Sequence, residues 1–431
     1  MANTYIQTYG CSANQNNSEI MAGILNQSGH ELTDLDNAEV IILNTCAVKK
    51  KTESKIKRKI QDLKNQFPNK KIIVTGCLAQ TDAKAIQKIN PDAVIFGTDH
   101  ITEIASHVQS NLVQINLSKK REEKILTPKI SSNKLIAIAQ ISEGCLSNCS
   151  FCKTKLAKGN LFSYPQEKII SSIKQDLESG AGEIWLTSQG NENYGMDSGQ
   201  NQLIPLLNKI LELPFNLKLR LGMMNPINLP NIEELIDIYK HPKMYKFLHI
   251  PIQSASNKIL NDMKRGYTIE KVEIILSKFK KEIPNLAFAT DIITGYPTET
   301  EEDHQKTVEL IKKYKPDILN LSKFSKHKGT SADKLKDLQK KILNQRNQEI
   351  MRVHRKTALE NKNKYLNNTI TVFVNKKNNN GCESRDENYN IILINTKENI
   401  LGKSLQVKIT TIGPHHMIGE TKKNLEIIEL I

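Results

Sequence analysis

Residues 144–152 read GCLSNCSFC and place Cys145, Cys149 and Cys152 in the spacing C-x3-C-x2-C, shortly after a predicted strand at Leu135–Gln140. Because only seven of the 431 residues are cysteines, chance would produce this spacing in about two of a thousand such chains. Zinc would require a fourth ligand, and no His or other Cys lies within about thirty residues. A [4Fe–4S] cluster on three cysteines leaves one iron open for a ligand, and the pattern favours that interpretation.

The sequence around this loop alternates strand and helix signals. Strands are predicted at Leu135–Gln140, Glu183–Ser188, Leu217–Gly222, Phe247–Ile252, Leu286–Ile293 and Ile318–Phe324, with helices near 166–179, 202–211, 231–240, 269–280 and 300–313 between them. Such alternation is typical of a parallel (β/α) barrel, here with six units instead of eight. A barrel this short is open on one side, where a bulky substrate could enter. We assign residues 134–364 to this domain.

The N-terminal part of the chain also predicts a parallel α/β domain. Buried strands are expected at Thr4–Thr8, Val40–Leu43, Ile72–Thr75 and Ala93–Phe96, with one helix capped by Ser18 and another at Lys55–Phe67. Continuous apolar strands that alternate with helices form sheets covered on both faces. We place this domain at residues 1–112 and interpret the polar, basic residues 113–133 as a linker.

Three further cysteines each follow a predicted strand directly: Cys11 in TYGC, Cys46 in LNTC and Cys77 in VTGC. The carboxyl ends of parallel strands share one edge of a sheet, where ligands bind. We therefore expect a second three-cysteine site, to which Gly10 and Gly76 allow close backbone approach. The alternative is three buried structural cysteines, which are common.

After about residue 365 the pattern changes to short β-rich segments. Strands are predicted at Thr369–Val374, Ile391–Ile394 and Leu405–Ile409, and the Asn- and Lys-rich residues Asn375–Asn380 are predicted to be a loop. These features indicate a small antiparallel barrel over residues 365–431. Cys382 is predicted to lie in a polar, Gly-bearing loop with no partner, and we interpret it as incidental.

The charge balance points to a polyanionic partner. The chain has 61 Lys and Arg against 46 Asp and Glu, a net charge of +15. Part of the excess lies in residues 49–59 (KKKTESKIKRK), and part lies at Arg346, Arg352, Arg355, Lys356, Lys362 and Lys364. Either cluster alone could be a solvated helix face, but together with the global excess they favour RNA or DNA.

No apolar run approaches the roughly 18 residues of a membrane span, and the N-terminus carries no secretion signal. We therefore expect a protein of the reducing cytoplasm with no membrane partner. Seven cysteines in that compartment are not expected to form a disulfide framework.

A C-x3-C-x2-C loop with an aromatic residue, Phe151, before its last Cys resembles the radical S-adenosylmethionine superfamily. Cys11, Cys46 and Cys77 upstream and a small β domain downstream narrow the resemblance to the methylthiotransferases, over essentially the whole chain. The segments that support it are NTCAVK, TGCLAQ, EGCLSNCSFCKTK, EIWLTSQ, MMNP, HIPIQS, MKRGYT, DIITGYPTET and SKFS. NTCAVK and the Lys-Leu-Ala-Lys-Gly segment resemble the archaeal and eukaryotic branch.

The resemblance implies an α/β protein with an N-terminal parallel domain, a partial (β/α)6 radical barrel and a C-terminal barrel of the TRAM type. It implies methylthiolation of N6-threonylcarbamoyladenosine beside the tRNA anticodon, with two [4Fe–4S] clusters and S-adenosylmethionine as cofactors. Cys145, Cys149 and Cys152 would hold the catalytic cluster that cleaves S-adenosylmethionine. Cys11, Cys46 and Cys77 would hold the cluster that carries the sulfur to be transferred.

The implied partners are the tRNA anticodon arm, an electron donor and a sulfur donor, and we expect a monomer. Alternatives remain open: methylthiolation of isopentenyladenosine in tRNA or of a ribosomal-protein aspartate, an iron–sulfur electron carrier without a substrate, and an RNA-binding protein with structural clusters. Open three-cysteine sites favour the enzyme.

Four positions depart from the family pattern. Gly190 stands where Asp is usual, at a strand end that the resemblance places against the methionine amino group of the cofactor. Lys158 replaces the usual Arg, which is not an equivalent residue for bidentate contacts. His327 and Lys328 replace the usual Arg-Pro pair.

Four other residues have two interpretations each. Gly295 could contact the cofactor nucleoside or could simply end a strand. His249 could be a catalytic residue, but we interpret it as a histidine at the core edge. Tyr194 and Tyr267 could stack on a base or could pack in the core.

Overall fold

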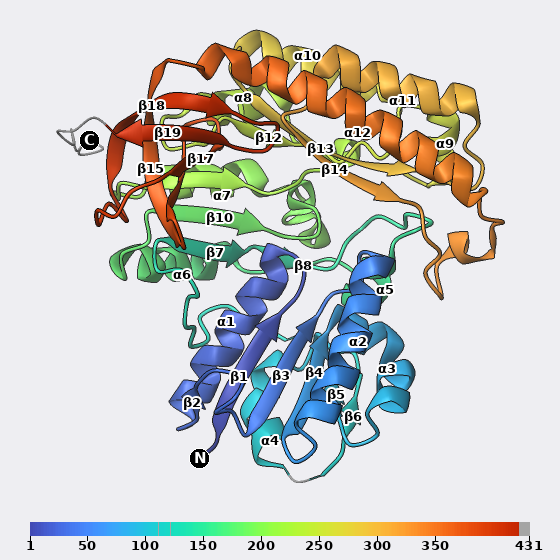
Figure 1. The fold of residues 1–431 in the computed structure, drawn as a ribbon, viewed down its shortest axis with the longest axis vertical. Helices are drawn as coiled ribbons and strands as arrows, with labels where there is room; N and C mark the ends of the chain where they lie inside the picture. Colours follow the sequence, from blue (N-terminus) through green and yellow to red (C-terminus); the bar gives the residue numbers. More distant parts are fainter. Residues whose placement is uncertain (111, 121, 422–431) are drawn as a thin grey trace.

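The computed structural model describes residues 1–110, 112–120 and 122–421. It contains three parts (Figure 1): an N-terminal sheet domain, an open barrel above it, and a β domain beside the barrel. No helix in the described ranges is long and apolar enough to cross a membrane.

The N-terminal domain is a parallel sheet in the order β2-β1-β3-β4-β5-β6. Alternate residues of its central strand enter two different cores: Ile41 and Leu43 pack with Ile56 on one face, and Ile42 packs with Met21 on the other. The sheet is therefore covered on both faces, as predicted. Its elements are β1 (Asn3–Thr8), α1 (Ser12–Gln27), β2 (Glu31–Leu32), β3 (Val40–Thr45), α2 (Lys50–Gln66), β4 (Lys71–Gly76), α3 (Cys77–Ile89), β5 (Val94–Phe96), α4 (Ile104–Gln109) and β6 (Ile115–Asn116).

Two details of this domain differ from the sequence prediction. Helix α1 begins at Ser12, with Cys11 at its N-cap position, so Ser18 does not cap it. Ser18 is instead buried inside the helix, where its hydroxyl accepts hydrogen bonds from Thr8 and Asn44 at the ends of β1 and β3. The segment interpreted as a linker contributes β6, which extends the sheet beside β5.

The barrel has six parallel strands in two three-stranded sheets, β11-β10-β7 and β12-β13-β14. A parallel bridge from Leu219 to Met244 connects the two sheets. The six-unit open barrel is therefore confirmed. Its strands are β7 (Ile136–Gln140), β10 (Glu183–Thr187), β11 (Lys218–Leu221), β12 (Phe247–His249), β13 (Ala287–Thr294) and β14 (Ile318–Lys323), and its helices are α6 (Gln166–Glu178), α7 (Leu203–Leu211), α8 (Ile232–Lys240), α9 (Asn257–Asp262), α10 (Ile269–Glu282), α11 (Glu301–Tyr314) and α12 (Lys340–Lys362).

Between β7 and α6 lie a two-stranded sheet of β8 (Ser142–Glu143) and β9 (Phe162–Ser163) and the short helix α5 (Lys153–Lys158). The chain in this region leaves the barrel and returns to it. As Figure 1 shows, α5 lies near the upper ends of α2 and α3 in the N-terminal domain. The cysteine loop therefore lies close to the junction of the two domains.

The C-terminal domain is a closed barrel in the order β15-β16-β17-β19-β18. All its pairings are antiparallel except β17 with β19, which is parallel. The prediction of a loop over Asn375–Asn380 was wrong, because β15 continues through Asn378 and turns directly into β16. The strands are β15 (Thr369–Asn378), β16 (Gly381–Arg385), β17 (Ile391–Ile394), β18 (Ser404–Ile412) and β19 (Met417–Thr421).

Candidate iron–sulfur site

Cys145, Cys149 and Cys152 lie on the loop that follows β7 and β8 at the carboxyl end of the barrel. Gly144 begins this loop with φ +73°, and a Cβ there would lie 1.9 Å from the carbonyl oxygen of Asn160, so only glycine fits. The three thiols are partly exposed. The loop is thus a tight turn that presents three sulfurs at the mouth of the barrel.

The loop triad, as we call Cys145, Cys149 and Cys152, is held from several sides. Gln189, at the end of β10, accepts a hydrogen bond from the Gly144 amide at 2.7 Å. Ser150 donates to the carbonyl of Asp262 at 3.0 Å, and its hydroxyl lies 2.9 Å from the Tyr296 hydroxyl. The Cys149 sulfur accepts a hydrogen bond of 3.1 Å from Nη1 of the buried Arg265. Hydrogen bonds to cluster sulfurs set reduction potentials, so Arg265 can tune a centre at this site.

Cys11, Cys46 and Cys77 follow the neighbouring strands β1, β3 and β4 at one edge of the N-terminal sheet. A Cβ on Gly10 would lie 2.8 Å from the Cys46 Cβ, so the β1 and β3 ends approach each other closely. Burial raises the pKa of the Cys77 thiol to about 12, and nearby Lys158 opposes this increase. A metal centre would therefore have to displace these protons, as metal binding to thiols does. We call these cysteines the sheet triad.

Helix α5 connects the two triads. It begins directly after Cys152, and its end packs into the N-terminal domain, where Ala157 belongs to the same core as Cys46 and Cys77. The helix has six residues, which corresponds to a length of about 9 Å. The loop that carries one triad is thus fixed rigidly against the domain that carries the other.

Buried ion pairs strengthen this junction. Lys153 of α5 lies 2.7 Å from Glu53 of α2, and both side chains are almost fully buried. His327, a departure from the family pattern, lies 3.1 Å from the same carboxylate. Burial alone raises the pKa of Glu53, but His327 and Lys153 outweigh it and hold the pKa below its ordinary value. His327 therefore forms part of the junction between the domains.

Lys158, which also departs from the family pattern, belongs to a second buried group of charged side chains, centred on Glu143. Its ammonium lies 3.4 Å from Glu143, which also receives Lys124 at 2.7 Å and the Tyr164 hydroxyl at 3.1 Å. Burial by itself raises the pKa of Glu143, but the two lysines lower it to about 2. Lys158 thus places a fixed positive charge close to Cys77, without the fork geometry of Arg.

The spacing of the sulfurs limits which single metal ions the two triads could hold. Among the described residues, the group formed by Glu301, His304 and Glu349 is the one whose ligand atoms all lie within 4.8 Å of one another. Neither cysteine triad is gathered so closely, whereas a tetrahedral zinc ion with bonds of about 2.3 Å would bring its sulfurs within about 4 Å. As they are arranged here, the sulfurs of neither triad are close enough together for a single tetrahedral zinc ion.

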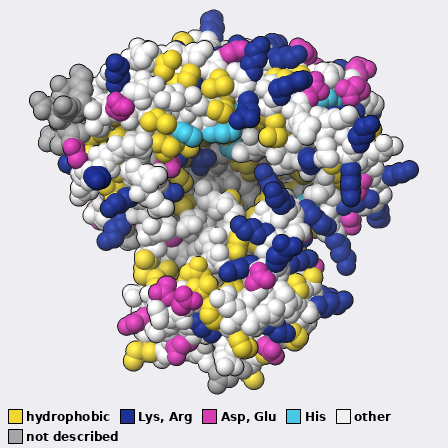
Figure 2. All heavy atoms as spheres, in the orientation of Figure 1, with side chains coloured by type: hydrophobic (Ala, Val, Ile, Leu, Met, Phe, Trp, Pro, Cys, Tyr) yellow, Lys and Arg dark blue, Asp and Glu magenta, His cyan; other side chains and the backbone are white. Residues whose placement is uncertain are grey.

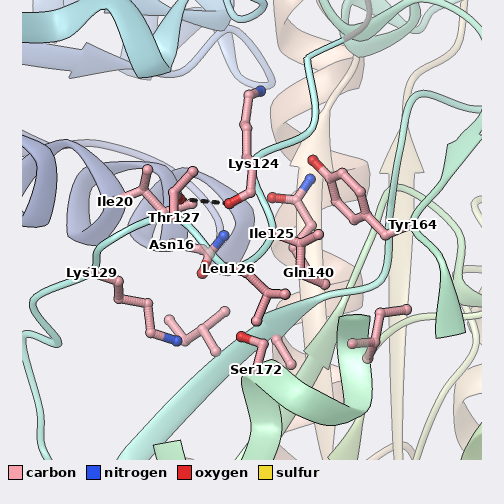
Figure 3. Close-up of a pocket in the computed structure, with 13 residues that line it drawn as sticks. Asn16, Ile20, Lys124, Ile125, Leu126, Thr127, Lys129, Gln140, Tyr164 and Ser172 are labelled. Carbon is pink, nitrogen blue, oxygen red and sulfur yellow. Dashed lines mark hydrogen bonds between the residues drawn. The ribbon is translucent and has the colours of Figure 1, made fainter. Parts of the chain in front are cut away.

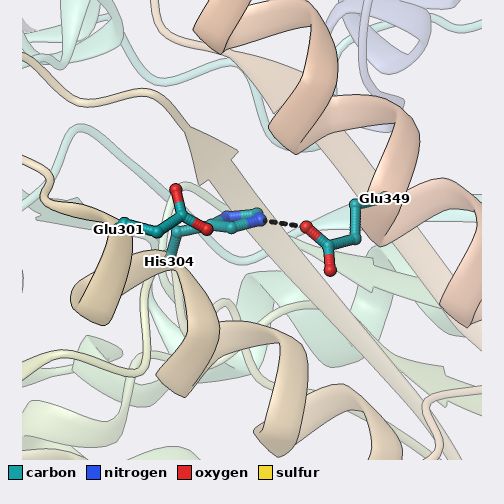
Figure 4. A group of neighbouring side chains, drawn as sticks. All are labelled: Glu301, His304 and Glu349. Carbon is teal, nitrogen blue, oxygen red and sulfur yellow. Dashed lines mark hydrogen bonds and ion pairs between the residues drawn. The ribbon is translucent and has the colours of Figure 1, made fainter.

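The close group itself is an ion-pair network (Figure 4). His304 of α11 lies 3.0 Å from Glu349 of α12. Arg346 lies 3.2 Å from Glu301 and 2.8 Å from Glu299. Because a guanidinium already neutralises these carboxylates, the group fastens α11 to α12.

The structure places the remaining sequence candidates as follows. Gly295 has φ +71° and lies in the turn after β13, where its amide donates to Glu299 at 2.9 Å; contact with a cofactor stays a prediction. His249, at the end of β12, lies 2.9 Å from Asp291. Tyr194 and Tyr267 are buried, with their hydroxyls bonded to backbone carbonyls, so they are packing residues. Cys382 lies in strand β16 within the core of the small barrel, not in a loop.

Two cavities lie outside the triads. The first (Figure 3) lies between α1, residues 124–129 and β7. Its volume is about 30 Å³, room for two or three water molecules when each needs about 10–15 Å³. The second, about 430 Å³, lies between the amino end of β11 and the small barrel. Neither cavity includes a cysteine.

Fewer of the predicted basic residues lie on the surface than the sequence suggested. Arg346 and Lys362 are buried and engaged, so they do not belong to a nucleic-acid surface. Arg352, Arg355 and Lys356 on α12 are exposed. Figure 2 shows Lys and Arg side chains gathered beside the hollow between the barrel and the N-terminal domain, over the region of α2 and α5. The positive charge thus borders the junction that holds the two triads.

Sequence reasoning missed several polar residues at the barrel mouth. Asn225 follows β11, Arg265 follows α9, and Glu192 follows β10. Burial raises the pKa of Glu192 to about 7. The signal was present for two of them, since MMNP contains Asn225 and MKRGYT contains Arg265, but nothing in the sequence distinguishes Glu192 from a surface residue.

Fold comparisons agree with this architecture. The chain superimposes with a TM-score of 0.56 on a radical S-adenosylmethionine methyltransferase, TsrM, from Kitasatospora setae, at 12% sequence identity, over 77% of each chain. It superimposes with a TM-score of 0.53 on the cobalamin-dependent S-adenosylmethionine radical enzyme OxsB, at 13% identity, over 82% of this chain and 56% of that one. Residues 139–311 match the Radical SAM superfamily. The barrel and its cysteine loop thus define a radical S-adenosylmethionine protein.

Sequence comparisons identify the family. Residues 3–97 match the family described as Uncharacterized protein family UPF0004. The chain is 37% identical to a probable threonylcarbamoyladenosine tRNA methylthiotransferase of Pyrococcus horikoshii, over 97% of this chain and 99% of that protein. It is 35% identical to the human threonylcarbamoyladenosine tRNA methylthiotransferase, over 98% of this chain and 74% of the human protein. The chain belongs to this family of tRNA methylthiotransferases.

Proposed function

We propose that this protein methylthiolates N6-threonylcarbamoyladenosine beside the tRNA anticodon, converting it to the 2-methylthio derivative. The observation that carries the proposal is the pair of cysteine triads, one at the barrel mouth and one at the sheet edge, joined by α5. The names of the relatives agree with this substrate. The cofactors would be S-adenosylmethionine and two [4Fe–4S] clusters.

The reaction replaces an unactivated aromatic C–H bond, which no acid or base side chain cleaves under mild conditions. A cluster with an open iron and S-adenosylmethionine supply that radical chemistry when bound. Cys145, Cys149 and Cys152 would hold the first cluster. Cys11, Cys46 and Cys77 would hold the second and the sulfur.

The contribution of the protein is to position these parts. Arg265 would hold the loop triad through Cys149, and the Lys153–Glu53 pair would fix the distance between the two centres. Fixing reactants in a productive arrangement lowers the barrier by removing the entropy of their encounter. The exposed arginines Arg352 and Arg355 would contact the anticodon arm through its phosphates. An electron donor and a sulfur donor complete the cycle, and we propose that the enzyme acts as a monomer in the cytoplasm.

The proposal is tested by mass analysis of tRNA nucleosides from cells that lack this chain. The 2-methylthio form of threonylcarbamoyladenosine should disappear, and the unmodified precursor should accumulate. Reintroducing the natural chain should restore the product, and a chain with the loop triad changed to Ala should not. An unchanged nucleoside profile would contradict the substrate. Loss of a methylthio group from isopentenyladenosine instead would favour the other tRNA substrate.

A further inference from the structure

Glu192 is an unusual residue at the mouth of the barrel. It lies in the short turn after β10, and its side chain is completely buried. Oε1 accepts hydrogen bonds from Asn193 at 2.6 Å and from Asn225 at 3.1 Å, whereas Oε2 has no hydrogen-bond partner. No cationic nitrogen of the described residues lies within ion-pair distance of this carboxylate. Burying a carboxylate oxygen without a donor is costly, so the site is incomplete as it stands.

The carboxylate occupies the space that a side chain at position 190 would take. A Cβ on Gly190 would lie 2.7 Å from Oε1 and 3.1 Å from Oε2 of Glu192. The φ of Gly190 is 178°, in the extended region that any residue adopts. The backbone therefore does not require glycine here. A larger residue at position 190 would require the carboxylate of Glu192 to move.

A chain of hydrogen bonds connects Glu192 to the loop triad. Asn225 donates to Glu192, Arg265 donates to Asn225, and the same guanidinium donates to the Cys149 sulfur at 3.1 Å. Because Arg265 is already committed to Asn225 and Cys149, its charge does not pair directly with Glu192. The unpaired carboxylate and the triad thus lie on the same edge of the barrel, beside one another.

Glu192 is also held rigidly. Its backbone carbonyl accepts a hydrogen bond from Asn201 at 2.6 Å, and the neighbouring Asn193 accepts one from Asn228 at 2.7 Å. These contacts hold the turn in place, and the hydrogen bonds from Asn193 and Asn225 hold the carboxylate itself.

We infer that Glu192 binds the ammonium group of S-adenosylmethionine at the loop triad, and that Gly190 exists to leave room for this carboxylate. The inference rests on the proposed function, since it takes S-adenosylmethionine as the ligand. It assigns the anionic contact to position 192 and explains why position 190 has no side chain. The ammonium would donate to Oε2, the oxygen that the protein leaves without a partner.

The test measures binding by equilibrium dialysis on the iron-loaded full chain. Two probes are used: S-adenosylmethionine and its deamino analogue, which lacks the ammonium group. The natural chain should bind S-adenosylmethionine about 10- to 100-fold more tightly than the analogue, the range expected for a hydrogen bond between charged groups. Glu192→Gln should weaken binding of S-adenosylmethionine by a similar factor and leave binding of the analogue unchanged.

A relocated charge provides the second variant. Gly190→Asp alone should weaken binding, because its side chain collides with Glu192. The double variant Gly190→Asp/Glu192→Gly should recover most of the tenfold or greater preference for the ammonium. Iron content and the spectrum of the loop cluster serve as controls for folding in each variant.

The outcomes are distinct. If the natural chain binds both probes equally, or if Glu192→Gln weakens both equally, the assignment of the ammonium to Glu192 is overturned while the proposed function stands. If the natural chain binds neither probe, the proposed function and this inference fail together.

Discussion

The two cysteine triads reach similar arrangements by opposite routes. Cys145, Cys149 and Cys152 lie on one short loop, which hydrogen bonds with Gln189 after β10 and with Arg265 after α9 hold in place. Cys11, Cys46 and Cys77 come from three strand ends, and the sheet itself holds them. One triad thus depends on a short loop that neighbouring elements fix in place, and the other depends on the strand order of a sheet. Under the proposed function, the loop triad would hold the cluster that cleaves S-adenosylmethionine, and the sheet triad would hold the sulfur to be transferred.

The largest expected effect comes from removing the loop triad. Changing Cys145, Cys149 and Cys152 together to Ala should lower the iron content of the reconstituted chain from about eight to about four atoms. It should abolish cleavage of S-adenosylmethionine, measured as 5′-deoxyadenosine. Native protein that contains zinc and little iron would contradict the cluster assignment for both triads.

Removing the sheet triad should separate two activities. With Cys11, Cys46 and Cys77 changed to Ala, about four irons should remain, and 5′-deoxyadenosine should still form because the barrel mouth is intact. The methylthio product should be absent, because the sulfur platform is lost. Chromatography of both products from one reaction measures the separation. Normal methylthiolation by this variant would rule out the assigned role.

The junction between the triads can be weakened without touching a cysteine. Lys153→Met should destabilise the chain by about 3 kcal/mol, because it leaves Glu53 buried without its lysine. The matched control is Lys168→Met, which removes the exposed pair with Glu123 and should cost less than about 1 kcal/mol. Urea unfolding of the metal-free chain measures both. Equal losses would show that the buried pair does not join the domains.

The exposed arginines of α12 should affect tRNA binding and neither triad. Arg352→Glu/Arg355→Glu should weaken binding to all tRNAs alike, because phosphate contacts carry no sequence information. The slope of log affinity against log salt should decrease by about 0.7–0.9 for each lost contact. Filter binding over a salt series measures both quantities, with the exposed Lys209→Glu on α7 as control.

A chain that ends near Lys364 extends this test. It should keep about eight irons and S-adenosylmethionine cleavage but bind tRNA with a shallower salt slope. If affinity and slope are unchanged, the basic residues of α2 become the main binding surface.

The smallest expected effect is the pH dependence of the junction. The folded pKa of Glu53 is lower than its ordinary value, so its pair with Lys153 stabilises the chain above the unfolded pKa of about 4.3. That contribution is lost as the pH falls further toward the folded pKa. The stability difference between the natural chain and Lys153→Met should therefore shrink below about pH 4.3. A difference that stays constant down to pH 3 would contradict this account.

The sequence by itself determined the order of the elements and the identity of the cysteines. Alternating apolar strands and helices predicted both parallel units, because buried parallel strands read as continuous apolar runs. The loop triad was visible from spacing alone, and the sheet triad from the position of each Cys directly after a strand. The small barrel was predicted with two of its strands missing, since β16 and β19 are short and mostly polar.

Only the tertiary structure decided which charges are free and which are engaged. Arg346, Arg352 and Arg355 look alike in the sequence, yet the first is buried against Glu299 and the other two are exposed. From the sequence, Gly190 indicates only that the usual carboxylate is absent. In the structure, the carboxylate of Glu192 lies in the space beside Gly190. The periodicity of the sequence predicts which face of an element is apolar. The partners of a buried charge come from distant parts of the chain, so their contact depends on how the domains pack. For this reason the junction at α5 and the carboxylate at the barrel mouth appear only in three dimensions.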